Sequence, residues 1–144
     1  WCNVICNFSI GHIGKEDFRG CNDKYDFVLD TDGKRTWGKS KSLLKEKDNS
    51  VFIWCNADQF VEYHGLGGFY SGMFISEVGE ALYCGLPGTE QDQVDESNYG
   101  FVNIISKYIN EDKNVIHEKV TGEYGLIAED NPVALYNNLR LYIN

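Results

Sequence analysis

The sequence predicts an α/β domain in which an open, mostly parallel sheet carries helices on both faces. A continuous apolar run at residues 50–56, SVFIWCN, is bounded by turn residues and is typical of a buried central strand in a parallel sheet. Apolar residues recur at helical spacing over residues 94–109. Strand-like and helix-like segments alternate along the chain, as they do in βαβ units. Because 144 residues can bury one sizeable core, we expect residues 1–144 to form a single domain.

Short strands and polar segments are expected before the central strand. Residues 3–10, NVICNFSI, are apolar and β-branched enough to form a buried first strand. Residues 11–23 are predicted to form a polar loop, and residues 25–30 a short strand or extended segment. Residues 39–47 resemble a short surface helix.

A loop at residues 57–71 is expected to lead into a helix with one carboxylate beside its apolar stripe. At about 100° per residue, Glu80 lies nearly opposite this stripe and is expected to be solvated. Glu77 lies at the edge of the stripe and is expected at the edge of the core. Such a carboxylate could act as a nucleophile or bind hydroxyl groups, or it could simply be a half-exposed helix residue. The stripe consists of Phe74, Val78, Ala81 and Leu82.

The end of the chain is predicted to contain two strands and a helix. Residues 115–120 and 123–128 are interpreted as strands joined by a tight turn. Asn131 is a suitable N-cap, and Pro132 fits the first position of a final helix. The apolar face of that helix is expected to hold Ala134, Leu135, Leu139 and Tyr142.

Charge and composition restrict the classes of partner. The chain carries 22 acidic and 13 basic residues, for a formal net charge of -9. This balance argues against a nucleic acid polymer or an anionic membrane surface as partner, because both need a cationic surface. No stretch approaches the roughly 18 apolar residues of a membrane span. A small nucleotide held by backbone amides at a helix start is compatible with the charge.

Cysteine and histidine usage predicts neither disulfides nor a metal centre. The five cysteines form no C-x-x-C pair, and several lie in apolar runs, which is typical of buried free thiols in a reducing compartment. We therefore expect a cytoplasmic protein. His12, His64 and His117 have no cysteine or glutamate at ligand spacing, so neither a metal nor another cofactor is expected. The five cysteines are Cys2, Cys6, Cys21, Cys55 and Cys84.

Polar side chains follow the predicted strands at one edge of the sheet. Ligands of open α/β sheets bind beyond the carboxyl ends of the parallel strands. Asn7 and Ser9 lie at the end of the first strand, and Asn56 and Asp58 follow the central strand. This edge also includes the glycine-rich segment before Glu77, whose candidate binding residues are Tyr70, Ser71 and Gly72.

The segment from Glu77 to Pro87, EVGEALYCGLP, resembles the E-x-G-x-A-x-x-x-G-x-P pattern of nucleoside 2-deoxyribosyltransferases. In that family the glutamate follows a Ser-Gly turn, and Ser71-Gly72 is similar. The apolar strand followed by Asp58 also resembles the family, and the likeness covers residues 50–87. Gly67-Gly68, followed by Gly72 and Glu77, is similar to the P-G-G-x-G-T-x-x-E motif of nucleotide phosphoribohydrolases. The fold expected from the order of strands and helices is Rossmann-like or flavodoxin-like.

The resemblance implies cleavage or transfer at the N-glycosidic bond of a nucleoside or nucleotide. Glu77 would be the nucleophile that attacks the anomeric carbon, and Asp58 would protonate or orient the departing base. A carboxylate suits this chemistry because the transition state resembles an oxocarbenium ion. Water as acceptor would make the protein a hydrolase, and a second base would make it a transferase. Tyr70 or Phe69 could stack on the base, and a neighbouring subunit of a homo-oligomer could complete the pocket.

Two other classes of function are compatible with the sequence. The same fold could hold a nucleotide-derived signal without turnover, as a sensor, sponge or regulatory subunit. The chain could also be a protein-interaction domain without a small ligand. In that case the segment between Asp58 and Gly72 would cover the strand ends instead of opening a pocket.

Overall fold

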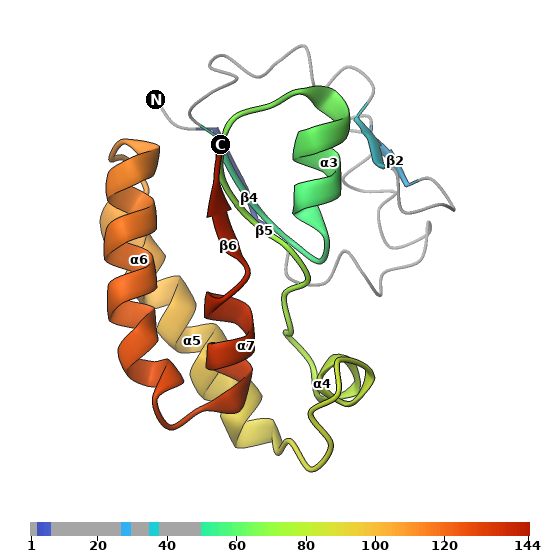
Figure 1. Cartoon of the computed structure of the whole chain (residues 1–144), viewed down its shortest axis with the longest axis vertical. Helices are drawn as coiled ribbons and strands as arrows, with labels where there is room; N and C mark the ends of the chain where they lie inside the picture. The colour runs from blue at the N-terminus through green and yellow to red at the C-terminus, as the bar shows by residue number, and fades with distance from the viewer. Residues whose placement is uncertain (1–2, 7–26, 30–34, 38–49) are drawn as a thin grey trace.

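The computed structural model describes residues 3–6, 27–29, 35–37 and 50–144, and these residues form a mixed α/β fold. The main sheet has the strand order β1-β4-β5-β6 (Figure 1). The first two pairings are parallel and the pairing of β5 with β6 is antiparallel, so the described sheet is mixed. Its strands are β1 (Asn3–Cys6), β4 (Ser50–Ile53), β5 (Gly68–Ser71) and β6 (Leu141–Ile143). A separate antiparallel pair consists of β2 (Phe27–Leu29) and β3 (Arg35–Trp37).

Helices lie on both sides of the main sheet. In Figure 1, α3 lies on one side, α5 and α6 lie on the other, and α4 lies beyond the end of β5. The predicted α/β class is therefore confirmed, whereas the narrower Rossmann-like assignment stays a prediction. The helices are α3 (Ala57–His64), α4 (Val78–Tyr83), α5 (Gln91–Tyr108), α6 (Lys113–Ala128) and α7 (Pro132–Asn138).

The core lies between the main sheet and the helices α5, α6 and α7. The rings of Phe74, Phe101 and Tyr124 pack in a continuous row, with centroids 4.9 Å and 5.3 Å apart in successive tilted pairs. Such tilted aromatic pairs stabilise a core beyond their burial of apolar area. The core also contains Val51, Ile53, Phe69, Ile104, Ile105, Ile116, Val120, Ala128, Ala134 and Leu141.

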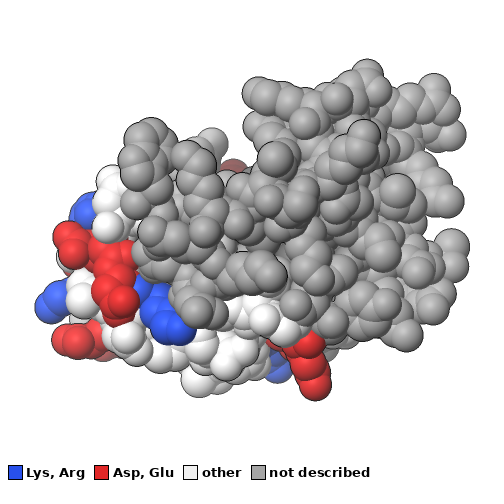
Figure 2. All heavy atoms as spheres, turned by 90° about the horizontal axis from the view of Figure 1, so that it is seen from above, with Lys and Arg blue, Asp and Glu red and all other residues white. Residues whose placement is uncertain are grey.

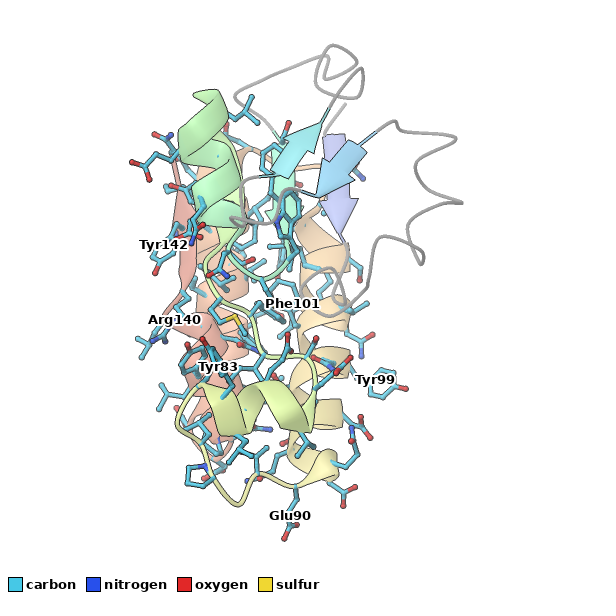
Figure 3. The ribbon with its side chains drawn as sticks, turned by 90° about the vertical axis from the view of Figure 1, so that its right-hand side faces the viewer. Tyr83, Glu90, Tyr99, Phe101, Arg140 and Tyr142 are labelled. Atoms are coloured by element: carbon cyan, nitrogen blue, oxygen red, sulfur yellow. The ribbon has the colours of Figure 1, made fainter. Side chains whose placement is uncertain are left out.

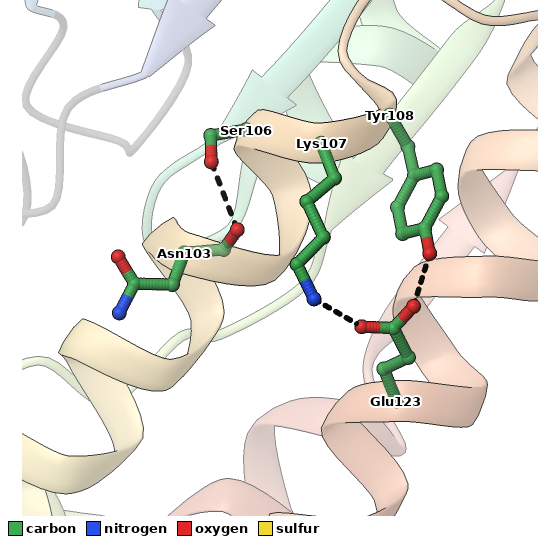
Figure 4. Close-up of polar contacts among 5 residues, drawn as sticks. All are labelled: Asn103, Ser106, Lys107, Tyr108 and Glu123. Atoms are coloured by element: carbon green, nitrogen blue, oxygen red, sulfur yellow. Dashed lines mark hydrogen bonds and ion pairs between the residues drawn. The ribbon is translucent and has the colours of Figure 1, made fainter.

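Polar contacts join α5 to α6 at the edge of this core (Figure 4). The Lys107 ammonium donates to the Glu123 carboxylate at 2.7 Å, and the Tyr108 hydroxyl donates to the other Glu123 oxygen. These bonds lower the pKa of Glu123, because both donors favour its ionised form. The contact links the last turn of α5 to α6 at a partly exposed position.

Several sequence predictions are confirmed by the described residues. The strands β1, β2 and β4 fall inside the segments predicted at residues 3–10, 25–30 and 50–56. The helix predicted at residues 94–109 is α5, which begins three residues earlier at a capping box. The Asn131 side chain caps α7 by accepting from the backbone N–H groups of Val133 and Ala134. The loop expected at residues 11–23 and the helix expected at residues 39–47 lie outside the described residues.

The predicted loop at residues 57–71 is wrong, because this segment contains α3 and β5. Helix α3 turns Ala57 and Val61 into the core and ends at Gly65, which has φ +59°. Strand β5 begins at Gly68, where a Cβ atom would lie 2.1 Å from the Ser50 carbonyl oxygen. Glycine is needed there for close approach of the two strands, although its frequency in this segment is typical of a loop.

The two strands predicted within residues 115–128 are also wrong, because the whole segment is helix α6. Its buried residues recur every fourth position, which is helical spacing. The β-branched residues of this segment favoured the strand interpretation. The buried set is Ile116, Val120, Tyr124 and Ala128.

The final helix faces the core differently from the prediction. Ala134 is buried as predicted, but Leu135 and Leu139 are 47% and 67% exposed, and α7 also buries Val133 and Asn137. Tyr142 is not helical, because the helix ends at Asn138 and the chain then forms β6.

Alkaline pH is expected to destabilise the protein through Tyr124. Burial raises the pKa of this phenol to about 12 from an ordinary value of 10.0. Because the folded state favours the neutral phenol, the resulting stability is present below pH 10 and is lost as the pH rises toward 12. The free energy of unfolding should fall by up to about 1.4 kcal/mol per pH unit in that window. Denaturant unfolding of wild type and Tyr124→Phe between pH 8 and pH 12 checks this.

The exposed Tyr83, of which 88% is accessible, provides the matched control for that titration. Tyr83→Phe should keep the wild-type dependence of unfolding free energy on pH, whereas Tyr124→Phe should make it shallower. Equal slopes in wild type and Tyr124→Phe would contradict the prediction.

Candidate functional site

A hollow of about 470 Å³ lies between α3 and the β5–β6 edge of the main sheet. One side is formed by residues of α3, and the strands contribute a pair of tyrosines. The hollow falls in the volume range of small-molecule sites. The described residues that line it are Asp58, Val61, Glu62, Gly65, Tyr70, Tyr142 and Asn144.

Tyr70 and Tyr142 form the aromatic part of the hollow. They are directly opposite each other in the antiparallel β5–β6 pair, and their ring centroids are 5.8 Å apart at an interplanar angle of 49°. Figure 3 shows Tyr142 on the same side of the ribbon as α3. The two rings give a flat ligand an apolar surface, and their hydroxyl groups add polar contacts.

Two carboxylates from one face of α3 form the acidic side of the hollow. Asp58 and Glu62 are four residues apart, so their side chains lie on one face of α3. Gly65 follows near the end of the same face. Asp58 lies in the first turn of the helix, where the helix dipole favours a negative charge. Its Oδ1 atom is shielded from solvent and has no hydrogen-bond partner among the described residues.

Asn56 sets the start of α3 and hence the position of Asp58. Its backbone has φ 62°, in the left-handed region that asparagine tolerates better than most residues. The Asn56 N–H donates to the Gly72 carbonyl oxygen at 3.0 Å, which ties the end of β4 to the end of β5. The wall of the hollow is therefore anchored to the strand that carries Tyr70.

The environment of Tyr70 shows that the hollow disfavours negative charge. Burial raises the pKa of the Tyr70 phenol, and the nearby Asp58, Tyr142 and Glu62 raise it further. The phenol is therefore protonated at neutral pH and can donate a hydrogen bond.

Replacing Asp58 by asparagine is expected to lower the pKa of Tyr70. The substitution removes the larger of the two carboxylate contributions while keeping the side-chain shape. The phenol titration can be followed by NMR of ¹³C-labelled tyrosine. Asp92→Asn is the matched control, because Asp92 lies in the first turn of α5. A Tyr70 titration that is the same in Asp58→Asn and wild type would contradict the geometry of the hollow.

Glu80 is buried and not solvated as predicted, and Glu77 is exposed and not at the edge of the core. Glu80 is 1% exposed, and Glu77 is exposed at the N-cap of α4. The helix begins only at Val78, so Glu80 occupies the third helical position and turns back over the helix start. The Glu77 carboxylate accepts a bond from the backbone at that third position. Glu77 is not among the residues that line the hollow.

The buried Glu80 carboxylate is a structural centre of the turn before α4. One oxygen, Oε2, accepts from the Ser76 N–H at 2.6 Å, the Ser76 hydroxyl at 3.0 Å and the Glu77 N–H at 3.1 Å. The other, Oε1, accepts from the Cys55 thiol at 3.0 Å. These bonds join the end of β4 to α4 and compensate for the burial of a charge-bearing group.

Cys55 and Cys84 are not in disulfides, and Cys55 is buried as predicted. Cys84 is half-buried at the end of α4. The side chain of Cys6 and the residues Cys2 and Cys21 lie outside the described part of the chain.

The other predicted binding residues are only partly described. Asn7 and Ser9 lie outside the described residues. The Ser71 hydroxyl is buried, donates to the Trp54 carbonyl oxygen at 2.9 Å and accepts from the Trp54 N–H at 3.1 Å. Gly72 packs beside Tyr142, because a Cβ atom there would lie 3.2 Å from its ring. These residues connect the strand ends, and Asp58 and Tyr70 are the predicted residues that line the hollow.

Sequence reasoning missed Glu62, Tyr142 and Asn144 as lining residues. The signal for Glu62 was its spacing of four from Asp58, which has meaning only once residues 57–64 are known to be helical. Tyr142 and Asn144 carried no such signal, because they reach the hollow only through the pairing of β6 with β5.

Within residues 50–144 and the described strands before them, no group of three or more His, Cys, Asp or Glu side chains could hold a metal ion. No helix in the described parts of the chain is long and apolar enough to cross a bilayer. Comparison with known proteins finds no matching family model, no matching curated protein and no matching solved structure.

Proposed function

We propose that this protein binds a small nucleoside-type molecule in the hollow between α3, β5 and β6. The base would lie against the rings of Tyr70 and Tyr142. The carboxylates of Asp58 and Glu62 would accept hydrogen bonds from hydroxyl or amino groups of the ligand. The observation that carries the proposal is that Asp58 and Tyr70, each a candidate from the sequence, line the same hollow.

The unpartnered oxygen of Asp58 supports a ligand with hydrogen-bond donors. A shielded carboxylate oxygen without a partner is energetically unfavourable. Asp58 is one of the residues that line the hollow, so donor groups of a bound ligand would lie close to its carboxylate. A sugar hydroxyl or an exocyclic amino group could then supply the missing bond.

Binding without turnover is the form of this function that the described geometry favours. A nucleophile must reach the anomeric carbon of a bound substrate, and Glu77 caps α4 outside the hollow. Figures 1 and 3 show α4 well separated from α3. A sensor, sponge or regulatory role is therefore our leading proposal. N-glycosidic cleavage or transfer through Glu77, in a Rossmann-like fold, remains the catalytic alternative, and a cytoplasmic homo-oligomer remains a prediction.

The test is a panel of nucleosides, nucleotides and dinucleotides such as NAD, assayed by calorimetry and by chromatography for released base. We expect at least one nucleoside to bind, and Asp58→Asn to weaken that binding by about tenfold or more, since a bond to a charged acceptor is lost. Asp92→Asn should bind like wild type, because its carboxylate lies in the first turn of α5. No binding and no base release across the panel would refute the proposal.

Glu77→Gln separates binding from catalysis. If the protein is a binding module, wild type releases no base and Glu77→Gln binds as tightly as wild type. If Glu77 is a nucleophile, wild type releases base and Glu77→Gln abolishes the release while keeping the affinity.

A further inference from the structure

The charge of the hollow restricts the kind of nucleoside that it can hold. We propose that the preferred ligand is a nucleoside whose base carries a positive charge, such as an N-alkylated purine nucleoside, and not a phosphorylated nucleotide. This inference rests on the proposed function, because it concerns the same hollow. It is carried by the arrangement of two carboxylates and two tyrosine rings around one space.

The two carboxylates lie close together without a cation between them among the described lining residues. Asp58 and Glu62 occupy successive turns of one face of α3, where like charges repel. Two basic groups of the described residues are not among those that line the hollow. Lys113 donates from α6 to the Asn144 carbonyl oxygen at 2.6 Å, and the Arg140 guanidinium stacks 3.5 Å from the Tyr136 ring centroid. A cationic ligand would relieve the repulsion between the two carboxylates.

The tyrosine pair also favours a positively charged ligand. The face of an aromatic ring is electron-rich and attracts organic cations, more strongly when water is excluded. Tyr70 and Tyr142 pack against each other with centroids 5.8 Å apart, so a base would lie over their joint surface and not between them. A positively charged base placed there would contact the rings and remain near the carboxylates of α3.

A phosphate group fits the hollow poorly. It would bring negative charge toward Asp58 and Glu62, and no lysine or arginine is among the described lining residues. The start of α3 does not compensate, because its first turn already carries Asp58. Recognition of phosphate normally uses basic side chains or free backbone N–H groups. Nucleotides are therefore expected to bind more weakly than the corresponding nucleosides.

Two isomeric nucleosides provide the test. 1-Methyladenosine is protonated and therefore cationic near neutral pH, whereas N6-methyladenosine, its isomer as the free base, is neutral. Calorimetry at low and at high salt should show 1-methyladenosine binding on the order of tenfold more tightly, with the preference reduced by salt. Adenosine 5′-monophosphate should bind more weakly than adenosine.

Variants show whether the preference comes from the hollow. Asp58→Asn with Glu62→Gln keeps the side-chain shapes and should remove the preference for the cationic isomer, while Asp92→Asn should keep it. Thermal unfolding confirms that each variant is folded. Equal binding of the two isomers by wild type, or an unchanged preference in the double variant, would overturn the inference and leave the proposed function standing. Failure of every nucleoside to bind would refute the proposed function itself.

Discussion

Glu80→Ala is expected to lower the free energy of unfolding by about 3 to 5 kcal/mol. The carboxylate is 1% exposed and accepts bonds from the Cys55 thiol, from the Ser76 hydroxyl and from the backbone N–H groups of Ser76 and Glu77. Alanine would leave these donors without their acceptor and would create a cavity beneath α4. Urea or guanidinium unfolding of wild type and variant measures the effect.

Glu77→Ala is the control for this prediction. Glu77 is exposed and contributes one capping bond to the same helix, so its loss should cost about 1 kcal/mol. The difference between the losses of unfolding free energy in Glu80→Ala and Glu77→Ala tests directly whether Glu80 is buried. Equal effects of the two substitutions would contradict the structure.

Asn137→Ala is expected to cost about 3 to 4 kcal/mol of unfolding free energy. The fully buried Asn137 side chain accepts from the Ile75 N–H at 2.7 Å and donates to the Ile75 carbonyl oxygen at 2.9 Å. It is thus bound to both backbone groups of one residue in the extended segment between β5 and α4. Alanine would leave both groups buried without partners. Chemical denaturation measures the loss of stability.

The neighbouring Asn138 supplies the control for Asn137. It is half-buried and donates one bond, to the Thr121 carbonyl oxygen at 3.2 Å. Asn138→Ala should cost about 1 kcal/mol, since a single backbone acceptor loses its donor. If Asn138→Ala were as destabilising as Asn137→Ala, the bridge to Ile75 would not be the source of the effect.

The parts of the fold that were predictable are those where local pattern and tertiary burial agree. The run SVFIWCN is apolar from Val51 to Cys55, and all of Ser50–Ile53 is buried in β4. Helix α5 has its buried residues at helical spacing, and α7 begins at a favourable cap and proline. Such elements can be predicted from the local sequence alone.

The elements that were missed depend on contacts with distant residues. Strand β5 contains glycine where β4 comes close, and β6 is a strand only because it pairs with β5. Helix α6 contains Val115, Ile116, Val120 and Thr121, whose side chains favour strands when they are considered locally. Its packing against α5 and α7 decides in favour of the helix.

The residues of the candidate site were predictable only where they flank elements with a clear local pattern. Asp58 and Tyr70 were found because they flank a clear strand and a glycine-rich segment. The burial of Glu80 was missed because the helical wheel was extended back to Phe74, whereas the helix begins at Val78. With the helix starting at Val78, Glu80 is its third residue. A glutamate at this position can fold back and accept a bond from the backbone at the helix start.

The position of β5 has a consequence for the order of folding. Its two partners in the sheet lie at very different distances along the chain: β4 immediately precedes α3, whereas β6 follows about seventy residues later. Closing the longer loop costs more chain entropy and cannot occur during synthesis until residues 141–143 have left the ribosome. Until then, the Tyr70 strand would have an unpaired edge, and the hollow would lack the Tyr142 side. The sheet and the proposed binding site would therefore be completed in the same late step.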